Sequence, residues 1–246
     1  MAKKEKIHDM FDSIAPEYDY LNHLLSMDID KRWRKKAVME IVDTDKPQRI
    51  LDVACGTGDF TIAIARKAML KREYDSDVHT VITGIDISEG MMRVGRKKLA
   101  KAGLSKDGES VSVELVQGDC ERLPYPDNYF DRISAGFGVR NFEHLDRGLK
   151  EMYRTLKSDG KVVILELSVP SNKIIRNIYK LYFTKLLPLV GGKISGKRSA
   201  YTYLPASVLN FPGPKEFQEM LRAAGFKSVR HKALTFGICR LYTGIK

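Results

Sequence analysis

Short apolar runs alternate with segments of helical periodicity through the middle of the chain, and this alternation constrains the fold more than any other feature. Runs typical of strands occupy residues 49–55, 78–86, 111–119, 130–138 and 160–168. Helical spacing fills residues 61–70, 88–103 and 146–157, the second with Ser88 as its expected N-cap. Strands joined through helices of about 10–15 residues need crossover connections, so the pattern predicts a doubly wound, Rossmann-like α/β sheet that is mostly parallel.

Two segments lie outside this alternation. Residues 1–45 are expected to form an N-terminal helical cap, and residues 170–205 a helical insertion after the fifth strand that acts as a lid. The chain then returns with a predicted helix over 214–225 and a terminal hairpin over 227–246, which brings the sheet to seven strands. Since no repeat or low-complexity tract interrupts it, the whole of 1–246 is expected to be a single domain.

The first predicted strand runs into a glycine turn, LDVACGTGDF, at residues 51–60. A phosphate-binding P-loop would need a lysine after its last glycine, and the turn has none. A dinucleotide fingerprint would need a third glycine where Thr61 stands. In addition, Asp52 and Asp59 bracket the turn, and carboxylates repel a pyrophosphate strongly in a partly dehydrated site. The turn therefore disfavours both kinds of phosphate ligand.

A ligand that carries positive charge near the turn suits these acids better. S-adenosylmethionine (SAM) has a cationic amine and a sulfonium. The spacing Asp52-x-Ala54-x-Gly56-x-Gly58 resembles the first motif of class I SAM-dependent methyltransferases, with Ala54 in place of the first glycine. Glycines there let the backbone approach a ligand closely. The resemblance implies that the cofactor contacts are made by Asp52, Gly56, Thr57 and Gly58.

Further signals stand at the ends of the next strands. Asp86 closes the second predicted strand, where it would accept both ribose hydroxyls. Asp119 and Cys120 follow the third, where a side-chain carboxylate and a backbone N–H would contact adenine, and Gly136 lies at the end of the fourth. Each alone is commonly a turn or a helix cap. Their order along successive strand ends predicts a SAM site at the carboxyl edge of the sheet.

Longer segments carry a more specific resemblance. Residues 11–36, FDSIAPEYDYLNHLLSMDIDKRWRKK, the FGVRN segment at 137–141 and the tail YTYLPASVLNFPGPKEFQEMLRAAGF at 201–226 resemble the ubiquinone/menaquinone biosynthesis C-methyltransferase family. The resemblance covers nearly the whole chain. It implies SAM-dependent methylation of a ring carbon, beside a hydroxyl, in a polyprenylated quinol. One departure is that some members carry serine where Gly136 stands here, so a hydroxyl contact from that position is lost.

The implied chemistry needs a proton removed, because a ring carbon is a poor nucleophile until its neighbouring hydroxyl ionises. A quinol hydroxyl has a pKa near that of tyrosine, about 10. Arg140 and Asn141 in FGVRN are the candidate catalytic residues. Arg140 would stabilise the phenolate or orient a water rather than act as a base, since a guanidinium does not give up its proton in proteins. The alternative for Arg140 is an ion pair with Glu143 or Asp146.

Further site residues are expected on the N-terminal helix and on the lid. Tyr18 and Asp19 are expected to close over SAM from the N-terminal helix, with simple lid packing as the alternative. Tyr179 and Phe183 are expected to contact the substrate from the lid. Candidate bases are the histidines His8, His23 and His144, although a histidine at a helix end is more often a surface or capping residue.

The net charge of +11 implies an anionic partner. No acid occurs between Glu166 and Glu216, and lysines and arginines alternate there with apolar residues at helical spacing. This pattern predicts a basic amphipathic lid over 172–200 that docks on an anionic membrane surface, with Trp33 of KRWRKK as an interfacial anchor. The alternative is that the apolar stripe packs on the sheet or against a second copy in a homodimer.

Two other functions are compatible with parts of the sequence. A nucleic-acid methyltransferase would suit the charge, but the chain lacks an (N/D/S)PP(Y/F/W) motif, and Cys120 is not preceded by proline. A non-catalytic SAM-binding component of a quinone-synthesising complex is the second alternative. The three cysteines lack metal-ligand spacing, so we expect no metal and a reduced compartment. Without a signal peptide or a spanning apolar run, the expected location is cytoplasmic, peripheral to the inner face of the membrane.

Overall fold

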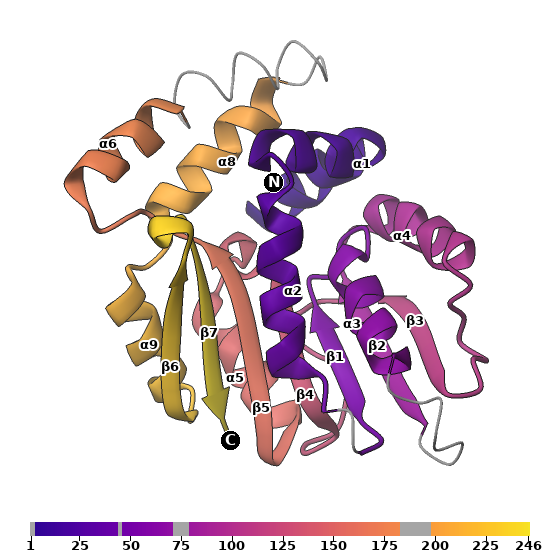
Figure 1. Cartoon of the computed structure of the whole chain (residues 1–246). Coiled ribbons are helices and arrows are strands. Elements are labelled where there is room, and N and C mark those ends of the chain that lie inside the picture. Colours follow the sequence, from indigo (N-terminus) through magenta and orange to yellow (C-terminus); the bar gives the residue numbers. More distant parts are fainter. Residues whose placement is uncertain (1–2, 44–45, 71–78, 183–197) are drawn as a thin grey trace.

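Seven strands form one sheet at the centre of the computed structural model, which describes residues 3–43, 46–70, 79–182 and 198–246 (Figure 1). They are β1 (Arg49–Val53), β2 (Thr80–Asp86), β3 (Val111–Gln117), β4 (Phe130–Gly136), β5 (Leu156–Leu167), β6 (Lys227–Leu234) and β7 (Cys239–Ile245). The strand order is β3-β2-β1-β4-β5-β7-β6. Strands β1 to β5 pair in parallel, and β7 is antiparallel to both neighbours. The predicted mostly parallel, seven-stranded sheet is confirmed.

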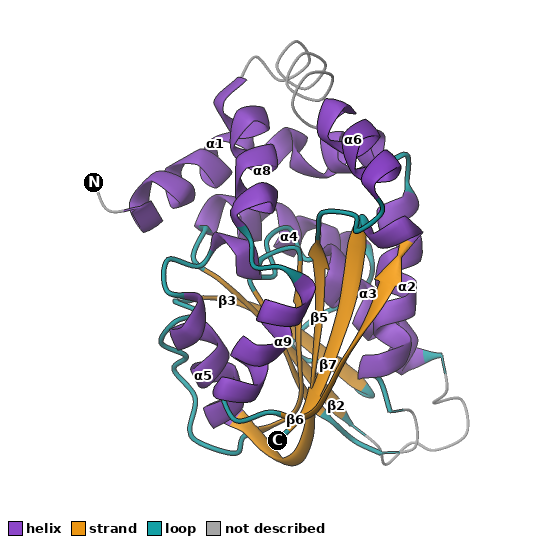
Figure 2. Ribbon diagram, turned by 90° about the vertical axis from the view of Figure 1, so that its left-hand side faces the viewer, coloured by secondary structure: helices purple, strands orange, loops and turns teal. Residues whose placement is uncertain are grey.

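Helices cover both faces of the sheet (Figure 2). The described helices are α1 (Lys3–Ser26), α2 (Ile29–Ile41), α3 (Asp59–Met69), α4 (Glu89–Lys101), α5 (Leu145–Thr155), α6 (Lys173–Leu181), α8 (Arg198–Asn210) and α9 (Pro214–Ala223), with short 3-10 turns η1 (Val139–Asn141) and η3 (Thr235–Gly237). Side chains of α2, α3 and α4 pack on one face, and those of α5 and α9 on the other. The chain is therefore doubly wound, as predicted.

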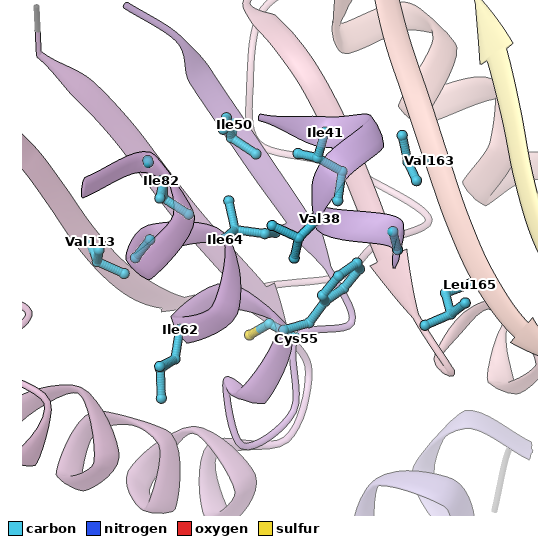
Figure 3. Close-up of a cluster of buried hydrophobic side chains, with 14 of the residues drawn as sticks. Val38, Ile41, Ile50, Cys55, Ile62, Ile64, Ile82, Val113, Val163 and Leu165 are labelled. Carbon is cyan, nitrogen blue, oxygen red and sulfur yellow. The ribbon is translucent and has the colours of Figure 1, made fainter. Parts of the chain in front are cut away.

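The core follows from the alternation of side chains along each strand. Ile50 and Val163 face the α2–α3 side, whereas their neighbours Leu51 and Ile164 face the α5–α9 side, and all four are fully buried. Figure 3 shows the first of these clusters, with α2 residues such as Val38 packed over the strands. Strands buried on both faces read as continuous apolar runs, which is why they stood out in the sequence.

Element boundaries differ slightly from the predicted ones. Strand β1 ends at Val53 because Ala54 has a φ of 53°, which leaves the extended region. Strand β5 begins at Leu156, before the predicted start at 160. Ser88 is the N-cap of α4, as predicted, and its hydroxyl accepts the backbone N–H of Met91 at 3.1 Å.

Three helices lie together above the carboxyl edge of the sheet (Figures 1 and 2). Ile14 of α1, Tyr179 of α6 and Val208 of α8 form a small buried cluster that joins them. The predicted insertion thus contains α6 and the start of α8, a helix that runs on to Asn210; residues 183–197 lie outside the described ones. None of the described helices is both long and apolar enough to span a bilayer.

Candidate functional site

A cavity of about 440 Å³ opens at the carboxyl edge of the sheet, beneath α1, α6 and α8. Its wall comes from the turn after β1, the ends of β2, β3 and β4, and side chains of α1, α2 and α6. Open α/β sheets bind ligands at this edge, near the point where the strand order reverses, which here is between β1 and β4. The volume is within the range of small-molecule sites.

The turn after β1 forms one side of this cavity. Gly56 lies on the wall with a φ of +54°, a left-handed conformation that favours glycine. Its N–H donates to Asp86 Oδ2 at 2.8 Å, and the N–H of Ser88 donates to Asp86 Oδ1 at 2.8 Å. Burial raises the pKa of Asp86, an effect that these backbone donors partly offset. Asp86 therefore fixes two turns while it faces the cavity together with Gly56 and Thr57.

The structure corrects the prediction for Asp52, which was expected to contact the ligand. Its side chain is fully buried and does not line the cavity. The carboxylate accepts the hydroxyls of Thr61 at 2.6 Å and Ser134 at 2.8 Å, so it ties α3 to β4 beneath the turn. Gly58 also lies off the wall, where a Cβ would approach Leu115 at 3.6 Å. Both residues support the turn rather than form its surface.

The buried Asp52 predicts a pH-dependent stability. Burial raises the pKa of Asp52 to about 6, so the folded protein holds this proton more tightly than the unfolded chain does. The neutral carboxyl therefore contributes up to about 3 kcal/mol to the free energy of unfolding below about pH 4, and this contribution is lost as the pH rises through about 6. Asp52→Asn should remove this slope, so its unfolding free energy relative to wild type should rise with pH. Urea unfolding between pH 4.5 and 8 measures this. The exposed Asp107→Asn is the control, and a constant offset between Asp52→Asn and wild type would contradict the assignment.

The predicted adenine contacts and Gly136 also lie on the cavity wall. Asp119 and Cys120 follow β3, and Asp119 Oδ1 accepts the N–H of Glu121 at 2.9 Å. Gly136 ends β4, and a Cβ at that position would lie 2.8 Å from the ring of Phe60. A side chain there would have to displace this ring, which accounts for the glycine in this chain.

Arg140 has a partner that the sequence did not reveal. Its side chain is 5% exposed and forms an ion pair of 2.7 Å with Glu166, which is fully buried in β5. The backbone N–H of Arg140 also donates to Glu166, and its guanidinium donates to the carbonyl of Phe137. The suggested partners Glu143 and Asp146 are therefore wrong. The sequence feature that could have indicated this partner is Glu166 itself, because it is the one acid within the apolar run VVILELS.

Polar groups from three helical segments surround Arg140. Asn141 lines the cavity and accepts the hydroxyl of Tyr203 from α8 at 3.1 Å. Tyr18 and Tyr179 line it from α1 and α6. Burial raises the pKa of Tyr18 and of Tyr179, and the charge of Arg140 opposes the shift in both. The guanidinium thus lies on a part of the cavity wall that also carries phenols and an amide.

One predicted lid residue, Asp19, lies away from the cavity wall. It accepts the hydroxyl of Thr57 and the ammonium of Lys98, each at 2.5 Å. Asp19 therefore fastens α1 to the turn and to α4, which favours the lid-packing alternative for this residue. Phe183 lies outside the described residues.

The histidines considered as bases do not line the cavity. His8 pairs with Asp9, and His144 pairs with Glu121. His23 bridges Asp30 at 2.9 Å and Asp59 at 3.4 Å. The ligand atoms of His23, Asp28 and Asp30 approach one another closely enough to suggest a metal site, but Lys31 and Arg34 already pair with the two carboxylates. Consequently we assign no metal to this cluster.

Helix α2 contributes residues that the sequence reasoning missed. Asp30, Trp33 and Arg34 all line the cavity. Trp33 is only 6% exposed, and its indole N–H donates to the hydroxyl of Thr235 at 2.8 Å. The prediction of Trp33 as a membrane anchor is therefore wrong. The sequence predicted a helical cap over residues 1–45, but not that its second helix helps to form the site.

The strand order and the cavity at the β1–β4 reversal define the class I SAM-dependent methyltransferases. A SAM-dependent methyltransferase from Thermotoga maritima has the same fold, with a TM-score of 0.62 and 18% identity over 97% of this chain and 99% of that one. The profile of the ubiE/COQ5 methyltransferase family matches residues 1–246. The chain belongs to this family.

Two curated relatives are similar along almost the whole chain. A demethylmenaquinone methyltransferase from Bacteroides fragilis is 43% identical over 244 residues, which cover 99% of this chain and 94% of the relative. A ubiquinone/menaquinone biosynthesis C-methyltransferase UbiE from Geobacter sulfurreducens is also 43% identical over 244 residues, covering 99% and 90%. Both the family resemblance and the fold class expected from the sequence are confirmed.

Proposed function

We propose that the protein transfers the methyl group of SAM to a ring carbon of a polyprenylated quinol, converting demethylmenaquinol to menaquinol; a benzoquinol of ubiquinone biosynthesis is the alternative ring. The observation that carries this proposal is Arg140, a buried cation on a cavity wall that also carries the strand-end acids Asp86 and Asp119 and apolar side chains of α1 and α6. The names of the relatives support the substrate class.

The wall near β1, β2 and β3 fits SAM. Each oxygen of Asp86 already accepts one backbone N–H, yet a carboxylate has about four acceptor sites, so it can also accept both ribose hydroxyls. Asp119 and the N–H of Cys120 would contact adenine, and Gly56 and Thr57, which also line the cavity, would contact the ribose and methionine portion. When bound, SAM supplies an electrophilic methyl group on a sulfonium.

The chemistry proposed for Arg140 is electrostatic. A guanidinium beside the quinol hydroxyl lowers that hydroxyl's pKa, because an adjacent positive charge favours the phenolate. The hydroxyl proton passes to water, and the phenolate pushes electron density onto the neighbouring ring carbon, which loses its own proton to water once it has taken the methyl group. Glu166 keeps the guanidinium in place, and Asn141 and Tyr18, which line the same cavity, would orient the ring oxygens. Holding the ring carbon in line with the methyl group supplies the remaining acceleration.

Assays with labelled SAM test this function. Label is expected in a short-chain demethylmenaquinol and not in bulk RNA. Label in RNA alone would favour the rival nucleic-acid methyltransferase, and label in neither acceptor, with SAM still bound, would favour a non-catalytic component of a quinone-synthesising complex. A demethylbenzoquinol tested in parallel distinguishes the two rings.

The prenyl tail is proposed to leave through the apolar end of the cavity. This end is formed by side chains of α1, α6, α8 and the segment before β7: Ile7, Phe11, Ile175, Ile178, Leu204 and Ile238. Tyr179 and Tyr182 of α6 lie on the same wall. Because the exit runs past α6, a substrate dissolved in a bilayer could reach the ring site without leaving the lipid entirely.

Helix α6 is proposed to dock on an anionic membrane surface. Ile174 and Ile178 are 73% and 64% exposed, and Leu181 lies beside them. Phe236 in η3 is also exposed and has a φ of 57°, an unfavourable conformation for a bulky residue. Lys173 and Lys180 flank the apolar ridge, and no acid occurs over residues 167–215. Basic groups around exposed apolar side chains match anionic headgroups over acyl chains. On this proposal the protein is peripheral to the inner face of the cytoplasmic membrane.

Flotation with anionic liposomes tests the docking surface. Ile174→Glu combined with Ile178→Glu should lower membrane binding by at least about 100-fold, because each buried side chain contributes about 1.5–3 kcal/mol. The matched control is Met39→Glu with Leu70→Glu, which adds the same charge at exposed apolar positions of α2 and the end of α3. Unchanged flotation of the α6 variant would contradict docking, and a simultaneous change from dimer to monomer would indicate that a second copy covers the ridge.

A further inference from the structure

Arg34 of α2 is a second cation on the cavity wall. Its side chain is 13% exposed, and its guanidinium pairs with Asp30 one helical turn earlier. A second guanidinium nitrogen lies 3.7 Å from Asp59 Oδ2, and the guanidinium carbon lies 5.6 Å from the centre of the Phe137 ring. Among the described residues that line the cavity, Arg34 and Arg140 are the cations. Both are paired with acids, but Arg140 is 5% exposed beside the fully buried Glu166, whereas Arg34 is more exposed and lies between two acids, Asp30 and Asp59.

The position of Arg34 follows from the strand order. Proceeding along the sheet, the cavity wall is formed by Asp119 after β3, Asp86 at the end of β2, the turn after β1, and Phe137 after β4. The proposed adenine and ribose contacts occupy the first two of these positions. An extended ligand would therefore place its amino-acid end near β1 and β4. Arg34 lies there, between Asp59 at the start of α3 and Phe137.

The charges in this corner suit an amino-acid zwitterion. A free α-amino acid group carries one carboxylate and one ammonium, which need a cation and an anion side by side on the protein. Arg34 with Asp59 and Asp30 supplies such a set. A guanidinium has five N–H donors in a planar fork that matches a carboxylate, and its pairing with Asp30 leaves donors available.

Asp30 is itself held in position. The hydroxyl of Ser26 donates to its Oδ1 at 2.7 Å, and His23 lies 2.9 Å from its Oδ2. Its carboxylate is only 6% exposed. This arrangement restricts the rotation of Arg34 and directs its fork toward the cavity end of α2, so little side-chain entropy would be lost on binding.

We infer that Arg34 binds the α-carboxylate of the methionine portion of SAM, and thereby selects ligands that keep an amino-acid end over nucleosides that lack one. This inference rests on the proposed function, since it takes SAM as the ligand. It assigns to α2 a role in ligand recognition, whereas a purely structural Arg34 would only connect α2 to Asp30 and Asp59.

Calorimetric titration with two ligands separates these roles. S-adenosylhomocysteine has the amino-acid end, and 5′-deoxy-5′-methylthioadenosine has the same nucleoside without it. Arg34→Gln should weaken S-adenosylhomocysteine binding by about 10–100-fold, the size expected for hydrogen bonds between charged groups. Binding of methylthioadenosine should change less than about twofold, which also shows that the variant is folded. Arg34→Lys, with charge but no fork, should lie between wild type and Arg34→Gln.

The exposed Arg32→Gln is the matched control on the same helix, and it should bind both ligands as wild type does. Equal loss of both ligands in Arg34→Gln would mean a structural role and overturn the inference, as would unchanged affinity for both. Failure of the wild-type protein to bind S-adenosylhomocysteine would instead overturn the proposed function. The two failures are therefore distinguishable.

Discussion

Replacing Arg140 with leucine is expected to destabilise the protein by about 3–5 kcal/mol and to remove most methyl transfer. The stability loss follows from Glu166, which is fully buried and would lose its ion-pair partner. The activity loss follows from the proposed role of Arg140 beside the quinol hydroxyl. Urea unfolding measures the first effect, and single-turnover transfer from labelled SAM measures the second.

A double variant separates the two effects. Arg140→Leu combined with Glu166→Leu removes both charges, and replacing a whole buried pair by apolar residues is often nearly neutral. Most of the stability should therefore return, while methyl transfer should not. Recovery of activity in the double variant would show that Arg140 acts only through the fold.

The surface pair of Arg222 and Glu219 provides a control for the Arg140 experiment. These side chains are 46% and 71% exposed, with a separation of 2.6 Å. Because an exposed ion pair contributes little, Arg222→Leu should cost less than about 1 kcal/mol. A similar cost for Arg222→Leu and Arg140→Leu would contradict the claim that burial makes the difference.

The fold could be predicted because its strands are buried on both faces. The run VVIL at residues 162–165 of β5 shows this directly: alternate residues reach opposite layers of the core, so all four are apolar. Helix starts were readable where a local side chain caps the backbone, as at Ser88. Both the apolar strand runs and the helix N-caps are formed by residues that are adjacent in the sequence, so they can be recognised from the sequence alone.

The site was less predictable because its contacts depend on register and distant pairing. Asp52 and Asp86 look alike as acids near strand ends, but β1 continues one residue past Asp52, whereas Asp86 is the last residue of β2. The side chain of Asp52 therefore lies beneath the turn, whereas that of Asp86 lies on the cavity wall. Glu166 stands 26 positions from Arg140, and only the pairing of β4 with β5 brings them together.

The largest effect on ligand affinity is expected at Asp86, because its carboxylate has structural and ligand-binding roles at once. Asp86→Ala leaves the N–H groups of Gly56 and Ser88 without their acceptor and would remove the proposed ribose contacts. Two hydrogen bonds to a charged group contribute about 1.5–3 kcal/mol each, so affinity should fall by at least about 100-fold.

The pattern of loss across ligands gives the Asp86 prediction its test. Both S-adenosylhomocysteine and methylthioadenosine contain the ribose, so Asp86→Ala should weaken the two equally in calorimetric titrations, unlike Arg34→Gln. Asp146→Asn, at an exposed position in the first turn of α5, should leave both affinities unchanged. Selective loss of S-adenosylhomocysteine in Asp86→Ala would mean that Asp86 faces the amino-acid end, and the direction assigned to the ligand along the strand ends would have to be reversed.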